Sequence, residues 1–419
     1  MCKTVILTIG NEILNGKTLD TNAHWISNAL DNAGFRVYKK ISVGDSGEEI
    51  FQALKEAEDA GDIVLITGGL GPTKDDITKK TLAGYFDSEM SLNQVAYDRL
   101  QAFFTSRGFK MTELNRQQAI MPDKCTVIPN KLGTAQGMWF EKNDTVFISM
   151  PGVPHEMKNI MTYELIPLIS EKFKPGSIIH KMIHTAGIGE SWLADRIHDW
   201  EKSLSKSISV AYLPQFGFVS LRLTASGGVV ERLKSDINNA IIDLNSVAGP
   251  YIFGYDDDNL ESVIGRILTE KGESLAVAES CTGGHIGHII TSVPGSSAYF
   301  AGGIIAYSNM VKREQLGVRF ETLEKFGAVS EETVGEMAMG VKNLCSVDYA
   351  LATSGIAGPD GGTSDKPVGT VCIGLADKED VVTQKLNFVK DRMTNIRYTT
   401  NRALTMLWER LKAKNGDKI

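Results

Sequence analysis

The sequence predicts two doubly wound, three-layer α/β domains joined by a small α+β middle domain. Three observations predict this fold class. Short β-branched apolar runs end at glycines, segments with helical spacing lie between these runs, and the pattern changes to shorter strands in the middle of the chain. A length of 419 residues has room for two to four domains. The predicted domains are residues 1–172, 175–254 and 258–415.

The first domain has the pattern of a parallel sheet. Its three apolar runs, 4–9, 62–67 and 144–150, end at a glycine or a proline–glycine pair. Runs that are short and apolar on both faces are typical of buried parallel strands. Residues 21–33 and 48–60 have helical spacing, so strands and helices alternate. Ligands of such sheets bind beyond the carboxyl ends of the strands, which is where these glycine loops fall.

The middle domain shows no constellation of chemically active side chains. Its predicted strands and helices are residues 177–185, 190–201, 207–213, 219–225 and 230–247. The acidic stretch 255–259 after it is predicted to be a linker.

Composition excludes several classes of protein. A hydrophobic content of 42% argues against disorder, and the absence of an 18-residue apolar run excludes a membrane span. Five cysteines without a Cys-x-x-Cys pair argue against a disulfide framework or a thiolate zinc site, and favour the reducing cytoplasm. A net charge of −7 without a basic block gives no expectation of direct nucleic-acid binding.

In the third domain, Ser280 lies where the predicted strand 274–279 turns into a helix. That geometry exposes a side chain at the edge of the sheet. A serine hydroxyl needs a base to become a nucleophile, and Lys312 is the best candidate because burial turns lysine into a base. Tyr307, at the end of the strand 302–307, could relay a proton or hold Lys312 in place.

A purely structural interpretation competes with this one. Ser280 and Thr282 could cap a helix and Lys312 could be solvated, and spacing alone favours that interpretation because Ser and Thr are common N-caps. Cys281 is a rival nucleophile, although a free cysteine is usually buried packing.

A glycine-rich loop follows the strand 349–353. Residues 354–362 contain four glycines and a proline, which allow close approach to a phosphate or carboxylate and equally suit an ordinary turn. Arg392 and Arg397 on the last predicted helix could add phosphate contacts or be surface charges.

Several motifs of the third domain resemble the CinA C-terminal domain, which is similar to stand-alone nicotinamide-nucleotide amidases. They are Ala278-Glu279-Ser280-Cys281-Thr282-Gly283-Gly284, Pro294-Gly295-Ser296-Ser297, Tyr307-Ser308-Asn309 with Lys312, Gly327-Ala328-Val329-Ser330, and Ser354 to Gly362. The resemblance covers about residues 258–415. It implies hydrolysis of nicotinamide mononucleotide to nicotinic acid mononucleotide and ammonia, without a cofactor.

The resemblance assigns the catalytic serine and lysine to Ser280 and Lys312, with Tyr307 beside them, and so reverses the preference for helix capping. It also implies a set of residues that hold the nucleotide. These are Thr282, Gly283, Gly284, Ser354, Gly355, Ala357, Gly358, Arg392 and Arg397.

The loops of the first domain suit a pyrophosphate and a divalent cation. Glycines let a pyrophosphate approach the main chain, and carboxylates are ligands for Mg²⁺ or another divalent ion. The predicted substrate-binding residues are Gly10, Asn22, Gly68, Gly69, Gly71, Pro72, Thr73 and Gly152, and the predicted metal ligands are Glu12, Asp75 and Asp76. Asp75 and Asp76 could instead complement the dipole of a helix N-terminus.

These loops resemble the CinA N-terminal domain, itself similar to molybdopterin-binding domains, over residues 1–170. The family often has Gly-Asp-Glu where this chain has Gly10-Asn11-Glu12, which weakens a metal role for position 11. The resemblance implies metal-dependent hydrolysis of ADP-ribose to AMP and ribose 5-phosphate, and a homodimer. Molybdopterin binding is a fold-level analogy only. The alternative is a non-catalytic partner in competence or DNA damage.

Overall fold

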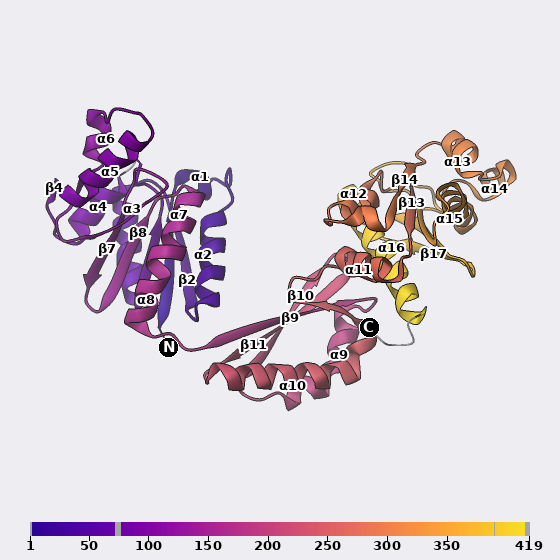
Figure 1. Ribbon diagram of the computed structural model, residues 1–419, viewed down its shortest axis with the longest axis horizontal. Coiled ribbons are helices and arrows are strands. Elements are labelled where there is room, and N and C mark those ends of the chain that lie inside the picture. The colour runs from indigo at the N-terminus through magenta and orange to yellow at the C-terminus, as the bar shows by residue number, and fades with distance from the viewer. Residues whose placement is uncertain (1, 72–76, 389, 415–419) are drawn as a thin grey trace. The chain divides into compact units, whose positions relative to one another are not determined.

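The computed structural model describes residues 2–71, 77–388 and 390–414 (Figure 1). The chain forms two compact units, one made of the residues up to 179 with 226–233, and the other of 180–225 with the residues from 234 onward. Within the described ranges, no helix combines the length and the apolar character needed to cross a membrane.

The first sheet has six strands in the order β2-β1-β3-β8-β7-β6. Their bounds are β1 Lys3–Ile9, β2 Arg36–Val43, β3 Ile63–Thr67, β6 Thr126–Ile128, β7 Gly137–Lys142 and β8 Thr145–Met150. The first four strands in this order pair in parallel, whereas β7 pairs antiparallel with β8 and β6 with β7. A short antiparallel pair, β4 Met90–Leu92 and β5 Ile120–Pro122, lies apart from this sheet.

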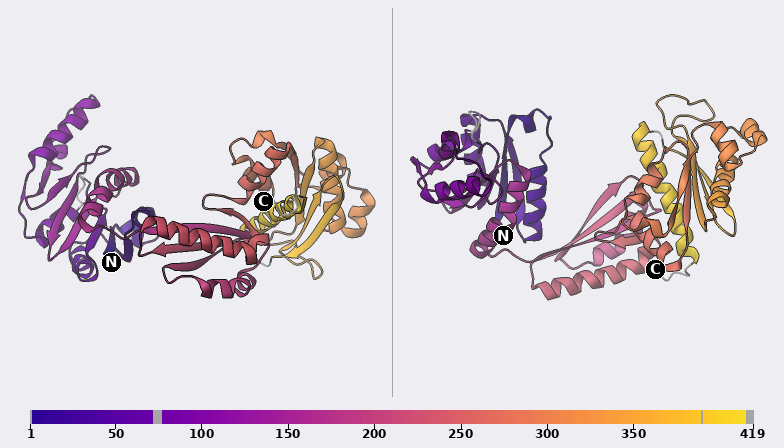
Figure 2. Two further views of the ribbon diagram at one scale, coloured as in Figure 1. Left: turned by 60° about the horizontal axis from the view of Figure 1, so that its bottom comes forward. Right: turned by 45° about the horizontal axis from the view of Figure 1, so that its top comes forward.

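Helices cover both faces of this sheet, so the unit has three layers (Figures 1 and 2). They are α1 Asn11–Leu14, α2 Thr21–Asn32, α3 Gly47–Ala60, α4 Thr78–Tyr85, α5 Gln94–Ser106, α6 Glu113–Gln117, α7 Pro154–Ile160, the π-helix η1 Met161–Leu165 and α8 Ile166–Phe173. Alternation along β1 separates the two cores: Val5 and Leu7 pack with α3, α4 and α5, and Ile6 packs with α2, α7 and α8. The predicted doubly wound first domain is therefore confirmed.

The second sheet is a four-stranded, largely antiparallel sheet in the order β10-β11-β9-β12. Its elements are β9 Ile178–Ala186, α9 Glu190–Ser203, β10 Ile208–Gln215, β11 Phe218–Ser226, α10 Val230–Ala248, the 3-10 helix η2 Gly249–Tyr251 and β12 Ile252–Tyr255. The strand β12 was not predicted. The stretch 255–259, predicted to be a linker, instead starts with the last residue of β12 and ends at Asn259, whose side chain caps the next helix.

The third sheet has five strands in the order β14-β13-β15-β16-β17. The strands are β13 Leu275–Glu279, β14 Phe300–Ile305, β15 Tyr349–Gly355, β16 Thr370–Ala376 and β17 Val381–Asn387. β14, β13 and β15 pair in parallel, whereas β16 pairs antiparallel with β15 and β17 pairs antiparallel with β16. The helices are α11 Leu260–Lys271, α12 His285–Thr291, the 3-10 helix η3 Ser296–Ala298, α13 Asn309–Leu316, α14 Phe320–Phe326, α15 Glu331–Cys345 and α16 Arg392–Lys414.

This sheet also lies between two helical layers. Val277 of β13 points into the core shared with α11, α12 and α16, and its neighbours Ala276 and Ala278 point into the core shared with α13, α14 and α15. The carboxyl ends of β13 and β14 meet at one edge of the sheet because the two strands are parallel neighbours. This edge carries the serine and the lysine singled out above.

A buried carboxylate joins α16 to the end of β16. Asp377 accepts hydrogen bonds from Arg410 Nε at 2.7 Å and Lys414 Nζ at 2.6 Å, and from the main-chain N–H groups of Glu379 and Asp380. Burial alone raises the pKa of this carboxyl, but the hydrogen bonds outweigh it and hold the pKa well below its ordinary value. The charged form therefore stabilises the folded third domain at neutral pH.

Replacing Asp377 by asparagine is expected to lower the free energy of unfolding of this domain by about 2 kcal/mol at pH 7. The folded pKa is depressed, so this contribution is lost as the pH falls below about 4. Hydrogen exchange of the β15 and β16 amides measures the loss at pH 7 and its disappearance in acid. A difference between the proteins that grows in acid would contradict this account.

Candidate functional site

Ser280 lies at a tight turn between β13 and α12. Its main-chain N–H still donates to Thr353 O at 2.9 Å, so the residue is held in line with the strand. The side chain is largely buried. The preceding Glu279 turns its carboxylate back over the loop and accepts N–H bonds from Gly284, Ile286 and Gly287 at 2.8–3.0 Å. A buried carboxylate thus takes the place of an N-cap side chain for α12 and fixes the turn that presents Ser280.

Lys312 lies on α13, the helix that follows the neighbouring strand β14, and its side chain reaches Ser280. Its Nζ is 3.1 Å from Ser280 Oγ and donates to Ala306 O at 2.7 Å. Only 1% of Lys312 is exposed. This burial lowers the pKa of the amine, an effect that the nearby Cys281 only partly opposes. A buried amine with a lowered pKa, within hydrogen-bond distance of a serine hydroxyl, is the arrangement that a general base and its nucleophile require.

Cys281 is enclosed in the apolar core of the third domain. Burial raises the pKa of its thiol to about 12, and its side chain belongs to the apolar cluster under α11 and α16. A thiol with a raised pKa holds little thiolate at neutral pH. Its geometry makes Cys281 a packing residue, in line with the sequence-based interpretation.

Tyr307 lies beside the pair but presents a different group from the one expected. Its main-chain carbonyl oxygen is 3.5 Å from Lys312 Nζ, whereas its exposed hydroxyl accepts a hydrogen bond from Arg392 Nη2 at 3.2 Å. Arg392 also donates through Nη1 to Gly358 O at 2.7 Å. The aromatic ring, the guanidinium and the glycine-rich loop are thereby joined above the edge that carries Ser280.

Four other predicted nucleotide-binding residues of this domain form hydrogen bonds within it. The hydroxyl of Thr282 forms a hydrogen bond with Thr353 Oγ1 at 2.7 Å, and the hydroxyl of Ser354 donates to Ala328 O at 2.6 Å. Both hydroxyls are therefore bonded within the domain. The N–H groups of Gly283 and Gly284 also close the turn rather than face outward.

Close packing explains two of the loop positions. A side chain at Gly355 would meet Val371 and Cys281. Ala357, two residues later, is buried, and its main-chain oxygen accepts a hydrogen bond from Asn395 Nδ2 at 3.0 Å.

Arg397 does not join Arg392 at the loop. The two residues are five positions apart on α16, which places them on different sides of the helix. The guanidinium of Arg397 lies over the ring of Phe216, 5.3 Å from its centroid. Phe216 belongs to the middle domain, which sequence reasoning treated as free of functional residues.

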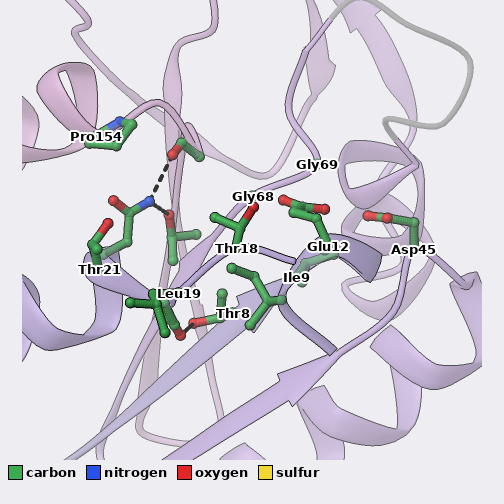
Figure 3. Close-up of a pocket in the computed structure, with 16 residues that line it drawn as sticks. Thr8, Ile9, Glu12, Thr18, Leu19, Thr21, Asp45, Gly68, Gly69 and Pro154 are labelled. Carbon is green, nitrogen blue, oxygen red and sulfur yellow. Dashed lines mark hydrogen bonds between the residues drawn. The ribbon is translucent and has the colours of Figure 1, made fainter. Parts of the chain in front are cut away.

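A second site lies in the first unit. A cavity of about 310 Å³ opens at the carboxyl ends of β1 and β3, and Gly10, Glu12, Asn22, Gly68, Gly69 and Gly152 of the predicted set line it (Figure 3). Asn22 Nδ2 donates to Gly152 O at 2.7 Å and to Thr67 Oγ1 at 3.2 Å, which joins three of the loops. Gly71 is not part of the lining, and Pro72, Thr73, Asp75 and Asp76 lie outside the described residues.

Two further carboxylates line this cavity and were not predicted. Asp20 accepts hydrogen bonds from Thr8 Oγ1 at 2.7 Å and from the N–H of Ala23, and so caps α2. Asp45 follows β2, accepts the N–H of Asn11 at 3.0 Å, and lies on the same side of the cavity as Glu12 (Figure 3). Asp45 could have been recognised as a residue that follows a strand, but β2 itself was not predicted.

The carboxylates of this cavity are oxygen ligands of the kind that suits a magnesium ion. Across the part of the chain that the structure describes, no three His, Cys, Asp or Glu side chains gather as a metal cage. Mg²⁺ is commonly held by one or two carboxylates together with substrate phosphates, and Glu12 and Asp45 can supply such carboxylates.

Comparison with known families divides the chain into three matched regions. Residues 5–171 match the model of a probable molybdopterin binding domain, residues 180–254 the damage-inducible protein CinA KH domain, and residues 257–411 the CinA C-terminal domain.

Relatives resemble the chain over nearly its whole length. A CinA-like protein of Cytophaga hutchinsonii is 46% identical over 407 residues, which cover 97% of both chains. A CinA-like protein of Flavobacterium psychrophilum is 43% identical and covers 99% of this chain and 100% of its own. A solved structure of a competence/damage inducible protein from Agrobacterium tumefaciens is 38% identical, covers 36% of this chain and 92% of its own, and has a TM-score of 0.35. The chain therefore belongs to the CinA family, with a molybdopterin-binding-like domain, a KH domain and a CinA C-terminal domain in this order.

Proposed function

We propose that the third domain hydrolyses the carboxamide of nicotinamide mononucleotide to give nicotinic acid mononucleotide and ammonia. The observation that carries this proposal is the 3.1 Å contact between Ser280 Oγ and the buried Lys312 Nζ. Acyl transfer from an amide needs a nucleophile, a base for its proton and an acid for the leaving nitrogen. Burial lowers the pKa of Lys312, so its amine can serve as base and then as acid.

The reaction balances in two steps. Lys312 Nζ takes the hydroxyl proton of Ser280 as Oγ attacks the carboxamide carbon, and passes a proton to the nitrogen as the C–N bond breaks and ammonia leaves. The nicotinoyl group is then an ester of Ser280. Water attacks this ester, Lys312 takes the proton of the water and returns it to Oγ, and the acid is released.

The contacts around the pair support binding of a nucleotide. Arg392 is held between Gly358 O and the hydroxyl of Tyr307, the residue whose main-chain oxygen lies 3.5 Å from Lys312 Nζ. The exposed ring of Tyr307 offers an aromatic face for the nicotinamide. Guanidinium groups bind phosphate through parallel N–H donors, so Arg392 is well placed to select a mononucleotide over free nicotinamide.

The test of this function is ammonia release by the purified full chain. Nicotinamide mononucleotide is supplied with and without a chelator, and ammonia and nicotinic acid mononucleotide are measured together. We expect one ammonia for each acid formed, no effect of the chelator, and much slower release from nicotinamide. Absence of ammonia from the mononucleotide rejects the proposal.

The cytoplasm is the proposed place of this activity. All five cysteines are free thiols, and Cys281 and Cys372 are buried in the core of the third domain. Proteins of oxidising compartments commonly pair their cysteines.

We also propose that the first domain hydrolyses ADP-ribose to AMP and ribose 5-phosphate with a divalent ion. The cavity lined by Gly68, Gly69, Glu12 and Asp45 supports this proposal (Figure 3). When bound, the ion would neutralise charge on the pyrophosphate. The protein's own part is to hold the phosphates against Gly68 and Gly69 and to keep the carboxylates in place through Asn11 and the loop after β2.

Replacing Glu12 by glutamine is expected to reduce AMP formation from ADP-ribose at least about 10-fold, because an amide is a weaker ligand for a hard cation. Product analysis by chromatography at several Mg²⁺ concentrations measures the change. Glu113→Gln removes an exposed carboxylate of the same domain and serves as the control. Ammonia release by the third domain should be unchanged in both variants. Turnover of ADP-ribose that a chelator does not affect would count against the ligand assignment.

A further inference from the structure

The middle domain ends its β10–β11 hairpin in a two-residue tip. Gln215 pairs with Phe218, which leaves Phe216 and Gly217 as the loop. Gly217 has φ of +80°, a conformation that favours glycine. Here, "hairpin tip" means Phe216 and Gly217.

The hairpin tip packs on one side of α16 in the third domain. Asn401 Nδ2 donates to Phe216 O at 2.6 Å, and the ring of Phe216 meets the ring of Tyr398 edge to face at 5.7 Å. The guanidinium of Arg397 lies 5.3 Å from the centroid of the same ring, within the range of a cation–π interaction. Three residues of α16, Arg397, Tyr398 and Asn401, therefore contact the hairpin tip.

The same turn of α16 faces the loop that presents Ser280. Thr400, one turn after Arg397, contacts Nδ1 of His285 through its hydroxyl at 2.9 Å. His285 is the first residue of α12, directly after the Ser280 turn. Burial lowers the pKa of His285, Glu279 opposes this effect, and the charges of His288 and Arg397 add to it. The turn of α16 that carries Arg397 is thus the turn that contacts the start of α12.

The middle domain lacks the features by which KH domains hold nucleic acid. These domains clamp the backbone of the nucleic acid with a Gly-x-x-Gly loop, and residues 180–254 contain no such sequence. The same residues carry seven Lys and Arg and seven Asp and Glu, so they have no excess of positive charge. The contact of the hairpin tip with α16 thus calls for a different explanation.

We infer that the hairpin tip of the middle domain positions Arg397 as a second arginine, in addition to Arg392, for the phosphate of the nucleotide substrate, which makes Phe216 a positioning residue of the amidase site. The inference rests on the proposed function. An exposed arginine has many rotamers, and ordering it during binding costs free energy. Stacking on Phe216 orders the guanidinium beforehand and leaves its in-plane N–H groups free for phosphate oxygens.

Steady-state kinetics of the full chain with nicotinamide mononucleotide tests this role. Phe216→Ala is expected to raise KM about threefold to fivefold with kcat unchanged, since Ser280 and Lys312 are not touched. Phe216→Trp should restore KM, whereas Phe216→Leu, which keeps bulk without an aromatic face, should not. Leu213→Ala, at an exposed position on the same hairpin, is the control and should leave KM unchanged.

A double-substitution cycle shows whether Phe216 acts through Arg397. In the Arg397→Ala background, Phe216→Ala should add no further rise in KM. Equal effects in both backgrounds, or a rise in KM that Phe216→Leu restores, would overturn the inference even though wild-type protein releases ammonia.

A second readout does not depend on catalysis. NMR titration of His285 should show a higher pKa in Phe216→Ala and in Arg397→Ala than in the wild type, because Arg397 loses its fixed place in the first and its charge in the second. If the wild type releases no ammonia, the amidase function is rejected, and with it the role of Phe216 and Arg397 in substrate binding. An unchanged His285 pKa in Phe216→Ala rejects the positioning of Arg397 itself.

Discussion

Replacing Ser280 by alanine is expected to reduce ammonia release from nicotinamide mononucleotide by about 10⁴-fold or more, with little change in affinity. The side chain that forms the covalent ester is lost, and Lys312 is left facing a methyl group. The turn itself should persist, because Glu279 holds it through main-chain N–H groups and the N–H of residue 280 still reaches Thr353 O.

Single-turnover experiments separate this explanation from a folding defect. Wild type should release ammonia in a burst before the acid appears if hydrolysis of the ester is the slower step, and mass spectrometry should find the nicotinoyl ester on the peptide that contains Ser280. Cys281→Ala is the matched control because Cys281 is adjacent in sequence yet buried in the core. Retained activity in Ser280→Ala, or a loss confined to Cys281→Ala, would remove Ser280 from the mechanism.

Much of the fold follows from the sequence because the central strands are buried on both faces. The runs that became β1, β3 and β8 are buried almost throughout and rich in apolar and β-branched residues, and each is followed by a glycine or a proline–glycine pair, so their positions and their loops could be predicted. The edge strand β2 alternates between exposed and half-buried residues and contains several charges. It lacks the pattern of a buried strand, and the carboxylate of Asp45 that follows it was missed for the same reason.

The serine and lysine pair shows where sequence reasoning stops. Spacing alone favoured helix capping for Ser280, because a serine before a helix is usually a cap. In the structure the cap is instead Glu279, a carboxylate at the end of a buried strand, which frees the serine hydroxyl for Lys312. Parallel pairing of β13 with β14 joins two residues that are 32 positions apart. The stacking of Arg397 on Phe216 joins two domains and has no local signal in the sequence.

Replacing Lys312 by methionine is expected to reduce kcat about 10³-fold or more while the protein stays folded. Methionine fills a similar volume, and the substitution removes an amine whose charged form burial disfavours. The matched control is Arg313→Met, an exposed neighbour on α13. If kcat fell in Arg313→Met and stayed unchanged in Lys312→Met, another group would have to be the base.

The pH dependence provides the sharper test because the sign of the effect is fixed by the chemistry. Only the neutral amine can accept the proton of Ser280, so kcat/KM of the wild type should rise with pH and level off above the pKa of Lys312. Burial lowers that pKa below the ordinary lysine value of 10.5, which moves the rise toward neutral pH. In Lys312→Met the residual activity should lose this rise. Lys312→Arg should be inactive throughout, because a guanidinium stays protonated at every pH at which the protein is folded. A profile that keeps the same midpoint in Lys312→Met would show that another group is the base.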